Sequence, residues 1–149
     1  MNRTWKIIGS VIVILVVGLL VIQIVPYGRD HTNPAVVQES NWDSPQTREL
    51  AQRACFDCHS NETDWTPWYT SIAPASWLVY RDVVEGRSRL NFSEWNRNFE
   101  IKREPQEISN IVLGGEMPPA QFLLMHSEAR LTQAEKEQLA AGLVATFQK

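Results

Sequence analysis

Cysteine is scarce in this chain, and that scarcity limits the possible architectures. Two cysteines occur among 149 residues, so they could form one disulfide at most, too few to hold together a small loop-rich scaffold. Seven glycines and eight prolines without a repeat also exclude collagen-like and low-complexity chains. The positions of the two cysteines must therefore explain why they are present.

Basic charge is lacking as well. The formal net charge is −3, and setting aside the N-terminal cations Arg3 and Lys6 leaves about −5 on the rest of the chain. Nucleic-acid binding needs a basic face that neutralises phosphates, so the sequence indicates no nucleic-acid partner. A protein partner with a basic surface fits this charge better.

Charged residues are absent from one long stretch near the N-terminus. Residues 7–25 read IIGSVIVILVVGLLVIQIV, in which only Ser10 and Gln23 are strongly polar, and such a run is long enough to cross a bilayer. Arg3 and Lys6 precede it, so the positive-inside rule places the N-terminus in the cytoplasm. A cleaved signal peptide is the alternative, although its apolar region is usually shorter and ends in small residues. We expect a single-pass anchor over residues 1–25 in the cytoplasmic membrane, with the remainder on the periplasmic or extracytoplasmic side.

The exported part divides into a linker and one domain. Residues 26–43 are polar and lack a helical period, which predicts a tether. Val36, Val37 and Trp42 allow the alternative that part of this stretch lies along the domain. Residues 44–149 have the length of one globular domain.

Helical signals dominate that domain. Ser44 and Pro45 predict a helix start, with Leu50 on its apolar face. A second helix is expected after Pro74, with Gly86 as its stop.

Two further helices are expected towards the C-terminus. One begins at Pro105 and ends at Gly114-Gly115. The last opens with a capping box, Thr132 to Glu135, and repeats Leu139, Leu143 and Phe147 every four residues. Alternating strands are absent, so the fold class is all-α, with long irregular connections at 60–73, 87–103 and 115–131.

Both cysteines lie in one motif, Cys55-Phe56-Asp57-Cys58-His59. In c-type haem attachment, two thiols with this spacing add to the porphyrin vinyl groups and the following histidine binds the iron. This predicts one covalently attached haem c, with Cys55 and Cys58 as attachment sites and His59 as an axial ligand. Three alternatives are weaker: a zinc site lacks further ligands, a thioredoxin-like pair lacks a βαβ pattern, and a disulfide would close a very small loop.

A second axial ligand should come from a distant part of the chain. Met117 stands between two glycines and two prolines in GGEMPP, where the following proline favours an extended backbone. Thioether sulfur is a weak ligand and therefore needs a rigid position. Met117 is the favoured candidate; His126, Met125, His31 and an open site remain alternatives.

The chain resembles the cytochrome c superfamily, and more closely a group of membrane-anchored bacterial haem-binding domain proteins. The shared stretches are RACFDCHSNETDW (53–65), PWYTSIAPASWLV (67–79), LNFSEW (90–95), GGEMPP (114–119) and LTQAEKEQLAAGL (131–143). The resemblance implies a cytochrome c-like helical domain wrapped around one haem, with His59 and Met117 as its axial pair and with its first and last helices packed together. His31 and the pair Met125-His126 have no role in this pattern.

Aromatic residues are dense around these motifs. Core packing explains most of them, but some could wall the porphyrin and bind its carboxylates. Trp77, Trp95 and Arg81 are the candidates for contacts to the haem propionates.

The expected function is electron transfer by a membrane-tethered monohaem c-type cytochrome, with redox proteins of a membrane electron-transport chain as partners. We expect no small-molecule substrate and no enzymatic conversion. The alternative is a haem-based gas or redox sensor, or a peroxide-reactive haem domain, whose sixth ligand is displaceable.

Overall fold

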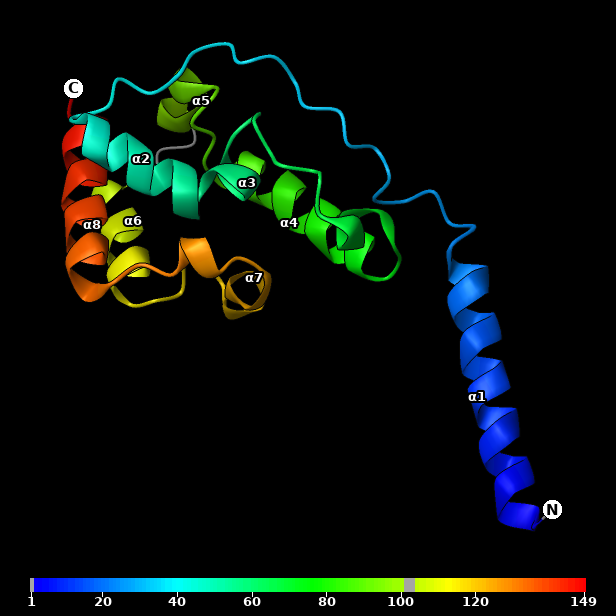
Figure 1. Cartoon of the computed structure of the whole chain (residues 1–149). Helices are drawn as coiled ribbons and strands as arrows, with labels where there is room; N and C mark the ends of the chain where they lie inside the picture. Colours follow the sequence, from blue (N-terminus) through cyan, green and yellow to red (C-terminus); the bar gives the residue numbers. More distant parts are fainter. Residues whose placement is uncertain (1, 101–103) are drawn as a thin grey trace. The chain divides into compact units, whose positions relative to one another are not determined.

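The computed structural model of the protein describes residues 2–100 and 104–149, with 98–100 described by their backbone alone. The expected all-α class is confirmed, because the described residues form helices and no strand. Gln38 and Glu94 make one isolated parallel bridge. The elements are α1 (Arg3–Ile22), α2 (Pro45–Ala54), α3 (Phe56–His59), η1 (Trp68–Ser71), α4 (Ala75–Arg89), α5 (Trp95–Glu100), α6 (Pro105–Leu113), α7 (Ala120–Met125), η2 (Ser127–Ala129) and α8 (Gln133–Phe147), where η denotes a 3-10 helix (Figure 1).

The chain divides into two compact units. Unit one comprises Met1–Thr32 and Trp65–Asp82, and unit two comprises Asn33–Asp64 and Val83–Lys149. Helix α4 contributes its first half to unit one and its second half to unit two.

Helix α1 covers most of the apolar run. It has 20 residues, which at 1.5 Å rise per residue is about 30 Å of helix. None of its described residues is buried in the protein. It is long and apolar enough to cross a membrane, a property that secretory signal sequences share.

Unit two is built around α8. Helices α2 and α6 both pack against it, as the cyan, yellow and red helices show (Figure 1). The buried core joins residues from these three helices to others near α3 and α5: Leu50, Ala51, Phe56, Leu90, Phe92, Trp95, Val112, Leu139, Ala140, Leu143 and Phe147. The packing of α2 against α8 is the contact that the family resemblance implies.

Local capping signals explain where the main helices start. The Ser44 hydroxyl accepts a hydrogen bond from the Thr47 amide at 3.2 Å, and Pro45 occupies the first turn of α2. At α8, Thr132 and Glu135 exchange both bonds of a capping box. Each cap satisfies amides that have no partner inside their own helix, and both expected starts are confirmed.

The expected end of the helix after Pro74 is wrong. Helix α4 continues to Arg89, so Gly86 lies inside it. A Cβ atom at Gly86 would stand 2.3 Å from the carbonyl oxygen of Cys58. Gly86 is therefore explained by a close tertiary contact and not by a helix stop.

The expected long irregular connections are interrupted by short helices. Helix η1 lies within 60–73, α5 within 87–103, and α7 with η2 within 115–131. These helices have six residues or fewer, too few to show a helical period in sequence. Residues 101–103 of the second connection lie outside the described residues.

The second half of the expected linker lies along unit two. The amides of Val37 and Gln38 both donate to the Ser93 carbonyl at 3.0 Å. Trp42 packs against the core, with its ring 5.0 Å from that of Phe92. Val37 nevertheless stays 77% exposed. Of the apolar residues expected to be buried along the domain, Trp42 is therefore the one that packs against the core.

Candidate functional site

The two cysteines flank a tight turn between α2 and α3. The Cys55 amide still bonds to Ala51 of α2 at 2.8 Å, while the His59 amide bonds back to the Cys55 carbonyl at 2.9 Å. Cys55 thus serves as both the C-cap of α2 and the N-cap of α3. The five residues of the motif occupy one continuous helical turn held at its start by the end of α2.

His59 is oriented by backbone carbonyl groups. Its Nδ1 lies 3.0 Å from the carbonyl oxygen of Leu90 and 3.1 Å from that of Gly86. Carbonyl oxygens only accept hydrogen bonds, so Nδ1 must carry the proton. In the neutral ring this tautomer places the lone pair on Nε2, which is the arrangement found in metal-binding histidines.

Close packing holds α4 against this turn. An added Cβ at Gly86 would also come within 3.1 Å of the Cys58 Cβ, so only glycine permits this approach. The same residue supplies one of the two carbonyls that orient His59. Backbone packing and histidine orientation therefore depend on one contact.

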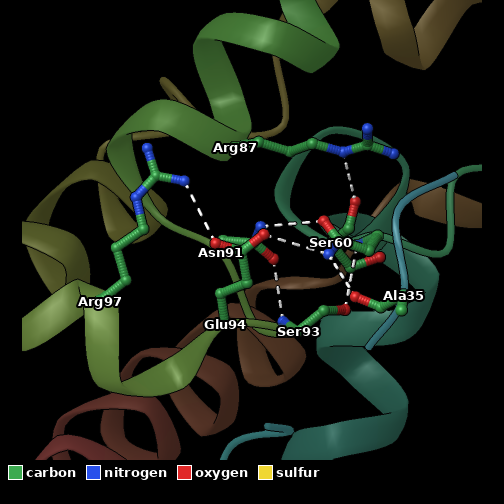
Figure 2. A network of polar contacts seen from close by, with 8 residues as sticks. Ala35, Ser60, Arg87, Asn91, Ser93, Glu94 and Arg97 are labelled. Carbon is green, nitrogen blue, oxygen red and sulfur yellow. Dashed lines mark hydrogen bonds and ion pairs between the residues drawn. The ribbon is translucent and has the colours of Figure 1, made fainter. Parts of the chain in front are cut away.

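Buried amide and hydroxyl groups fix the segment that follows His59. Asn91 Nδ2 donates to Asn61 Oδ1 at 3.0 Å, and the Ser93 amide donates to Asn91 Oδ1 at 2.9 Å. The Asn61 amide donates to Ser93 Oγ at 2.9 Å, and its side chain donates to Ala35 and Glu94. Figure 2 shows this network from close by. Such buried and mutually satisfied polar groups specify a single arrangement of the chain.

Arg87 and Phe92 complete the support. Arg87 Nε donates to the Ser60 carbonyl at 2.7 Å (Figure 2). Its guanidinium also donates to Thr63 Oγ1 at 2.9 Å. The Phe92 amide donates to the His59 carbonyl at 2.8 Å. The end of the turn and the residues just after it are thereby bonded to the stretch 87–93.

A largely apolar pocket opens beside this turn. The empty space in this pocket, including the open solvent at its mouth, has a volume of about 650 Å³. Cys55 and His59 line it together with Met117, while core residues from α6 and α8 form its walls. The lining residues are Cys55, His59, Arg89, Leu90, Phe92, Ile108, Ile111, Val112, Met117 and Leu143. Three of the residues that the sequence predicts as haem ligands or attachment sites thus meet at one pocket.

Met117 reaches the pocket from a loop. The amides of Glu116 and Met117 both bond to the Ile111 carbonyl, at 3.1 and 3.4 Å, and Gly115 has a positive φ of 74°. The Met117–Pro118 peptide bond is cis. The Met117 side chain remains 38% exposed.

Burial controls the ionisation of the motif's thiol and carboxyl groups. Burial, with a smaller contribution from the nearby Cys58, raises the pKa of Cys55 to about 12. Cys55 is therefore a neutral thiol at physiological pH, unlike the low-pKa thiolates that perform disulfide exchange. Burial also raises the pKa of Asp57, against the opposing hydrogen bond from the Asp64 amide.

The other predicted residues lie elsewhere. Trp95 is buried in the core of unit two, where its ring lies 4.5 Å from that of Phe147. Trp77 and Arg81 belong to unit one, and the indole Nε1 of Trp77 is buried with no hydrogen-bond partner in the described part of the chain. Their contact with haem propionates stays a prediction.

The two remaining histidines have structural contacts. His31 stacks on Trp65 with ring centroids 4.6 Å apart. His126 stacks on Phe122 at 4.0 Å, and its Nδ1 lies 2.9 Å from Glu128 Oε1. Neither histidine is among the residues that line the pocket.

Sequence reasoning missed Arg89 and the amide network. Arg89 lines the pocket but resembles an ordinary cation in the last turn of a helix. Asn61 and Asn91 resemble loop residues, because only the fold brings them together. The stretch LNFSEW was a usable signal, since it contains Leu90, Asn91 and Ser93.

Comparisons with known proteins identify one family. Its model, described as a haem-binding domain, matches residues 17–145. No curated protein and no solved structure matches the chain significantly.

Proposed function

The chain belongs to the haem-binding domain family, and on that premise we propose that it is a membrane-tethered monohaem c-type cytochrome that transfers electrons. One observation carries the proposal. The pocket that holds Cys55 and Met117 also holds a histidine whose Nδ1 proton is committed to backbone carbonyls. That tautomer is the one required for coordination through Nε2.

The residues present fit a covalently attached haem. Cys55 and Cys58 are separated by one turn, as two adjacent vinyl groups require. In each addition the thiol S–H bond breaks, a carbon–sulfur bond forms, and the hydrogen goes to the other vinyl carbon, so no oxidant is consumed. Apolar walls from α6 and α8 suit a porphyrin face.

Two side chains would complete the iron coordination. His59, through Nε2, and Met117, through its thioether sulfur, would hold the iron. Haem supplies a one-electron couple when bound, and a methionine ligand raises its reduction potential relative to a second histidine. The role of the chain is to hold both ligands and to keep water away from the pocket.

Arg89 would balance the charge of the cofactor. Among the described residues that line the pocket, it is the one full cation. A guanidinium can bind a carboxylate through two parallel hydrogen bonds. We therefore assign Arg89 to a haem propionate, while the contacts of Trp77, Trp95 and Arg81 with propionates stay a prediction from the sequence.

Helix α1 would tether the domain to the cytoplasmic membrane. Arg3 and Lys6 at its N-terminal end favour a cytoplasmic N-terminus, which places the haem on the periplasmic or extracytoplasmic side. Redox proteins of a membrane electron-transport chain would be the partners. On this proposal the protein is a carrier or an electron-transfer subunit and not an enzyme.

The test uses the full chain produced with haem-maturation machinery. We expect the intact mass to exceed the polypeptide mass by one haem, with a low-spin absorption spectrum in both redox states. The variant Cys55→Ser/Cys58→Ser should lose the covalent haem, whereas Ser60→Ala should retain it. A polypeptide of unmodified mass would contradict the proposal.

A second candidate function rests on the exposure of Met117. A ligand that is 38% exposed and supplied by a loop could be displaced by a diatomic gas or peroxide. The protein would then be a haem-based sensor or a peroxide-reactive domain. Ready carbon monoxide binding by the ferrous protein would favour this function, and its absence would favour the carrier.

A further inference from the structure

The end of α1 is joined to the η1–α4 region of unit one by a two-point contact. Gln23, the first residue after α1, donates from Nε2 to the Ala73 carbonyl at 2.9 Å. Its Oε1 accepts from the Ala73 amide at 3.0 Å. One side-chain amide thus pairs with both backbone groups of a residue far away in sequence. Gln23 is a polar residue in the apolar run, and this pairing gives both ends of its side-chain amide a partner.

Further contacts extend this attachment along the next residues. Tyr27 and Tyr80 make an edge-to-face contact with ring centroids 5.4 Å apart. Arg29 donates to the Gln23 carbonyl. His31 stacks on Trp65, and its Nε2 lies 3.0 Å from the Thr70 carbonyl. The stretch that follows α1 is therefore attached to residues 65–82 over several contacts, and it is not a free tether in this unit.

The attached region exposes large apolar side chains. Trp68 of η1 is 70% exposed, Ile72 beside Ala73 is 46% exposed, and Leu78 of α4 is 55% exposed. We call these three residues the η1–α4 surface. Ile72 directly precedes Ala73, the residue that Gln23 binds, and Leu78 lies in the first turn of α4, where its amide bonds to the carbonyl of Pro74, the residue after Ala73. Exposed apolar groups gathered in this way mark an interaction site more often than scattered ones do.

We infer that the η1–α4 surface lies in the interfacial layer of the same bilayer that α1 would cross. The inference rests on the proposed tether. A spanning helix brings its C-terminal end to the headgroup region, and the Gln23–Ala73 pairing brings the surface to that end. Tryptophan and tyrosine are enriched at this depth because they combine an apolar ring with a polar group. The partner chemistry is therefore a phospholipid surface.

The experiment places a photo-reactive probe in the full-length holoprotein. Benzoylphenylalanine is introduced singly at Trp68, Ile72, Ile24 or Val37, and each protein is reconstituted in nanodiscs of phosphatidylcholine and phosphatidylglycerol. Ile24 reports on the end of the apolar run. Val37 is an exposed apolar control in unit two. After illumination, mass spectrometry measures the fraction of protein that gains one phospholipid.

We expect lipid adducts at positions 68 and 72 in yields comparable to position 24 and well above position 37. Adducts at 24 without adducts at 68 and 72 would overturn the inference and leave the tether intact. Failure at all positions, 24 included, would remove the tether itself. Equal yields at all four positions, or adducts to a second copy of the chain instead of lipid, would also overturn the inference.

A second variant tests the contact that holds the surface in place. Gln23→Ala removes both hydrogen bonds to Ala73, together with one to the Leu19 carbonyl, and leaves the residues of α1 itself unchanged. The lipid adduct at position 72 should then fall, and the adduct at position 24 should not. An unchanged yield at 72 would contradict the role given to Gln23.

Discussion

The two sides of the pocket in unit two are built in opposite ways. On one side, His59 is held by two backbone carbonyls and by a turn packed against Gly86. On the other side, Met117 is 38% exposed and lies on a loop in which two backbone amides donate hydrogen bonds to the Ile111 carbonyl. We call these the histidine side and the methionine side.

The difference matches what each proposed haem ligand would require. A histidine must have the correct tautomer and ring orientation, and backbone carbonyls supply both at once. The buried bonds of Asn61, Asn91 and Ser93 then keep the following segment in place. A thioether has no tautomer to set, so position alone matters. The histidine side is therefore held by more contacts than the methionine side, and the exposed Met117 is the place where another ligand could enter.

The largest expected contrast comes from removing each ligand in turn. His59→Ala should prevent accumulation of the holoprotein, because the cofactor loses its firmly held ligand. Met117→Ala should retain covalent haem but become high-spin in part, and its reduction potential should fall by on the order of 100 mV. Absorption spectra and potentiometric titration measure both effects.

The matched control for that contrast is Met125→Ala, which removes an exposed methionine from α7. Its spectrum and potential should equal those of the unaltered protein. A Met117→Ala protein with unchanged spectrum and potential would show that Met117 is not a ligand.

Replacement of Gly86 and of Gly115 by alanine should lower the unfolding free energy by different amounts. Gly86→Ala places a Cβ 2.3 Å from the Cys58 carbonyl oxygen and should cost about 3 kcal/mol of unfolding free energy, even though alanine favours helices. Gly115→Ala meets no atom closer than 3.6 Å but has φ of +74°, so it should cost about 1 kcal/mol. Urea unfolding of the detergent-solubilised holoprotein measures both. Equal costs would contradict the asymmetry between the two sides.

The histidine side also shows how far sequence reasoning extends. Local rules were sufficient where the signal is local. Ser44 predicts the start of α2 and Thr132 predicts that of α8, because each cap bonds to amides in its own first turn. The motif likewise places Cys55 and His59 in one turn, because the bond between them, from the His59 amide to the Cys55 carbonyl, is local. The expectation that Met117 would face them came from ligand chemistry and from the family resemblance.

Sequence reasoning failed where the cause lies far away along the chain. Gly86 looks like a helix stop until Cys58 is seen against it. Asn61 and Asn91 are ordinary loop residues until they bond to each other. Arg89 looks like a C-terminal helix cation until the pocket is known. Short helices such as α7 carry too few residues for a period to be visible.

The charge at the pocket offers a smaller test. Arg89→Gln removes the cation that lines the pocket. A nearby positive charge favours the reduced state, which carries one more electron, so the reduction potential should fall by roughly 30–60 mV, equivalent to about 1 kcal/mol for one electron. The matched variant is Arg81→Gln in unit one. A shift for Arg81→Gln without one for Arg89→Gln would return the propionate role to Arg81.

The smallest expected effect is on the stability of the fold in acid. Arg53, two residues before Cys55, forms an ion pair with Glu135 of α8. The hydrogen bond from Arg53, then that from the Thr132 amide, lowers the pKa of Glu135 from 4.5 to about 2. A lowered carboxyl pKa stabilises the fold above pH 4.5, and this contribution is lost as the pH falls towards 2. Glu135→Gln should therefore have a lower unfolding free energy at neutral pH, and this free energy should fall less steeply between pH 4.5 and about 2. Glu137→Gln makes the same charge change on α8, and its unfolding free energy should fall with pH as that of the unaltered protein does. Urea unfolding at a series of pH values measures these free energies. If the plots of unfolding free energy against pH are parallel for Glu135→Gln and the unaltered protein, this ion pair does not stabilise the contact between α2 and α8.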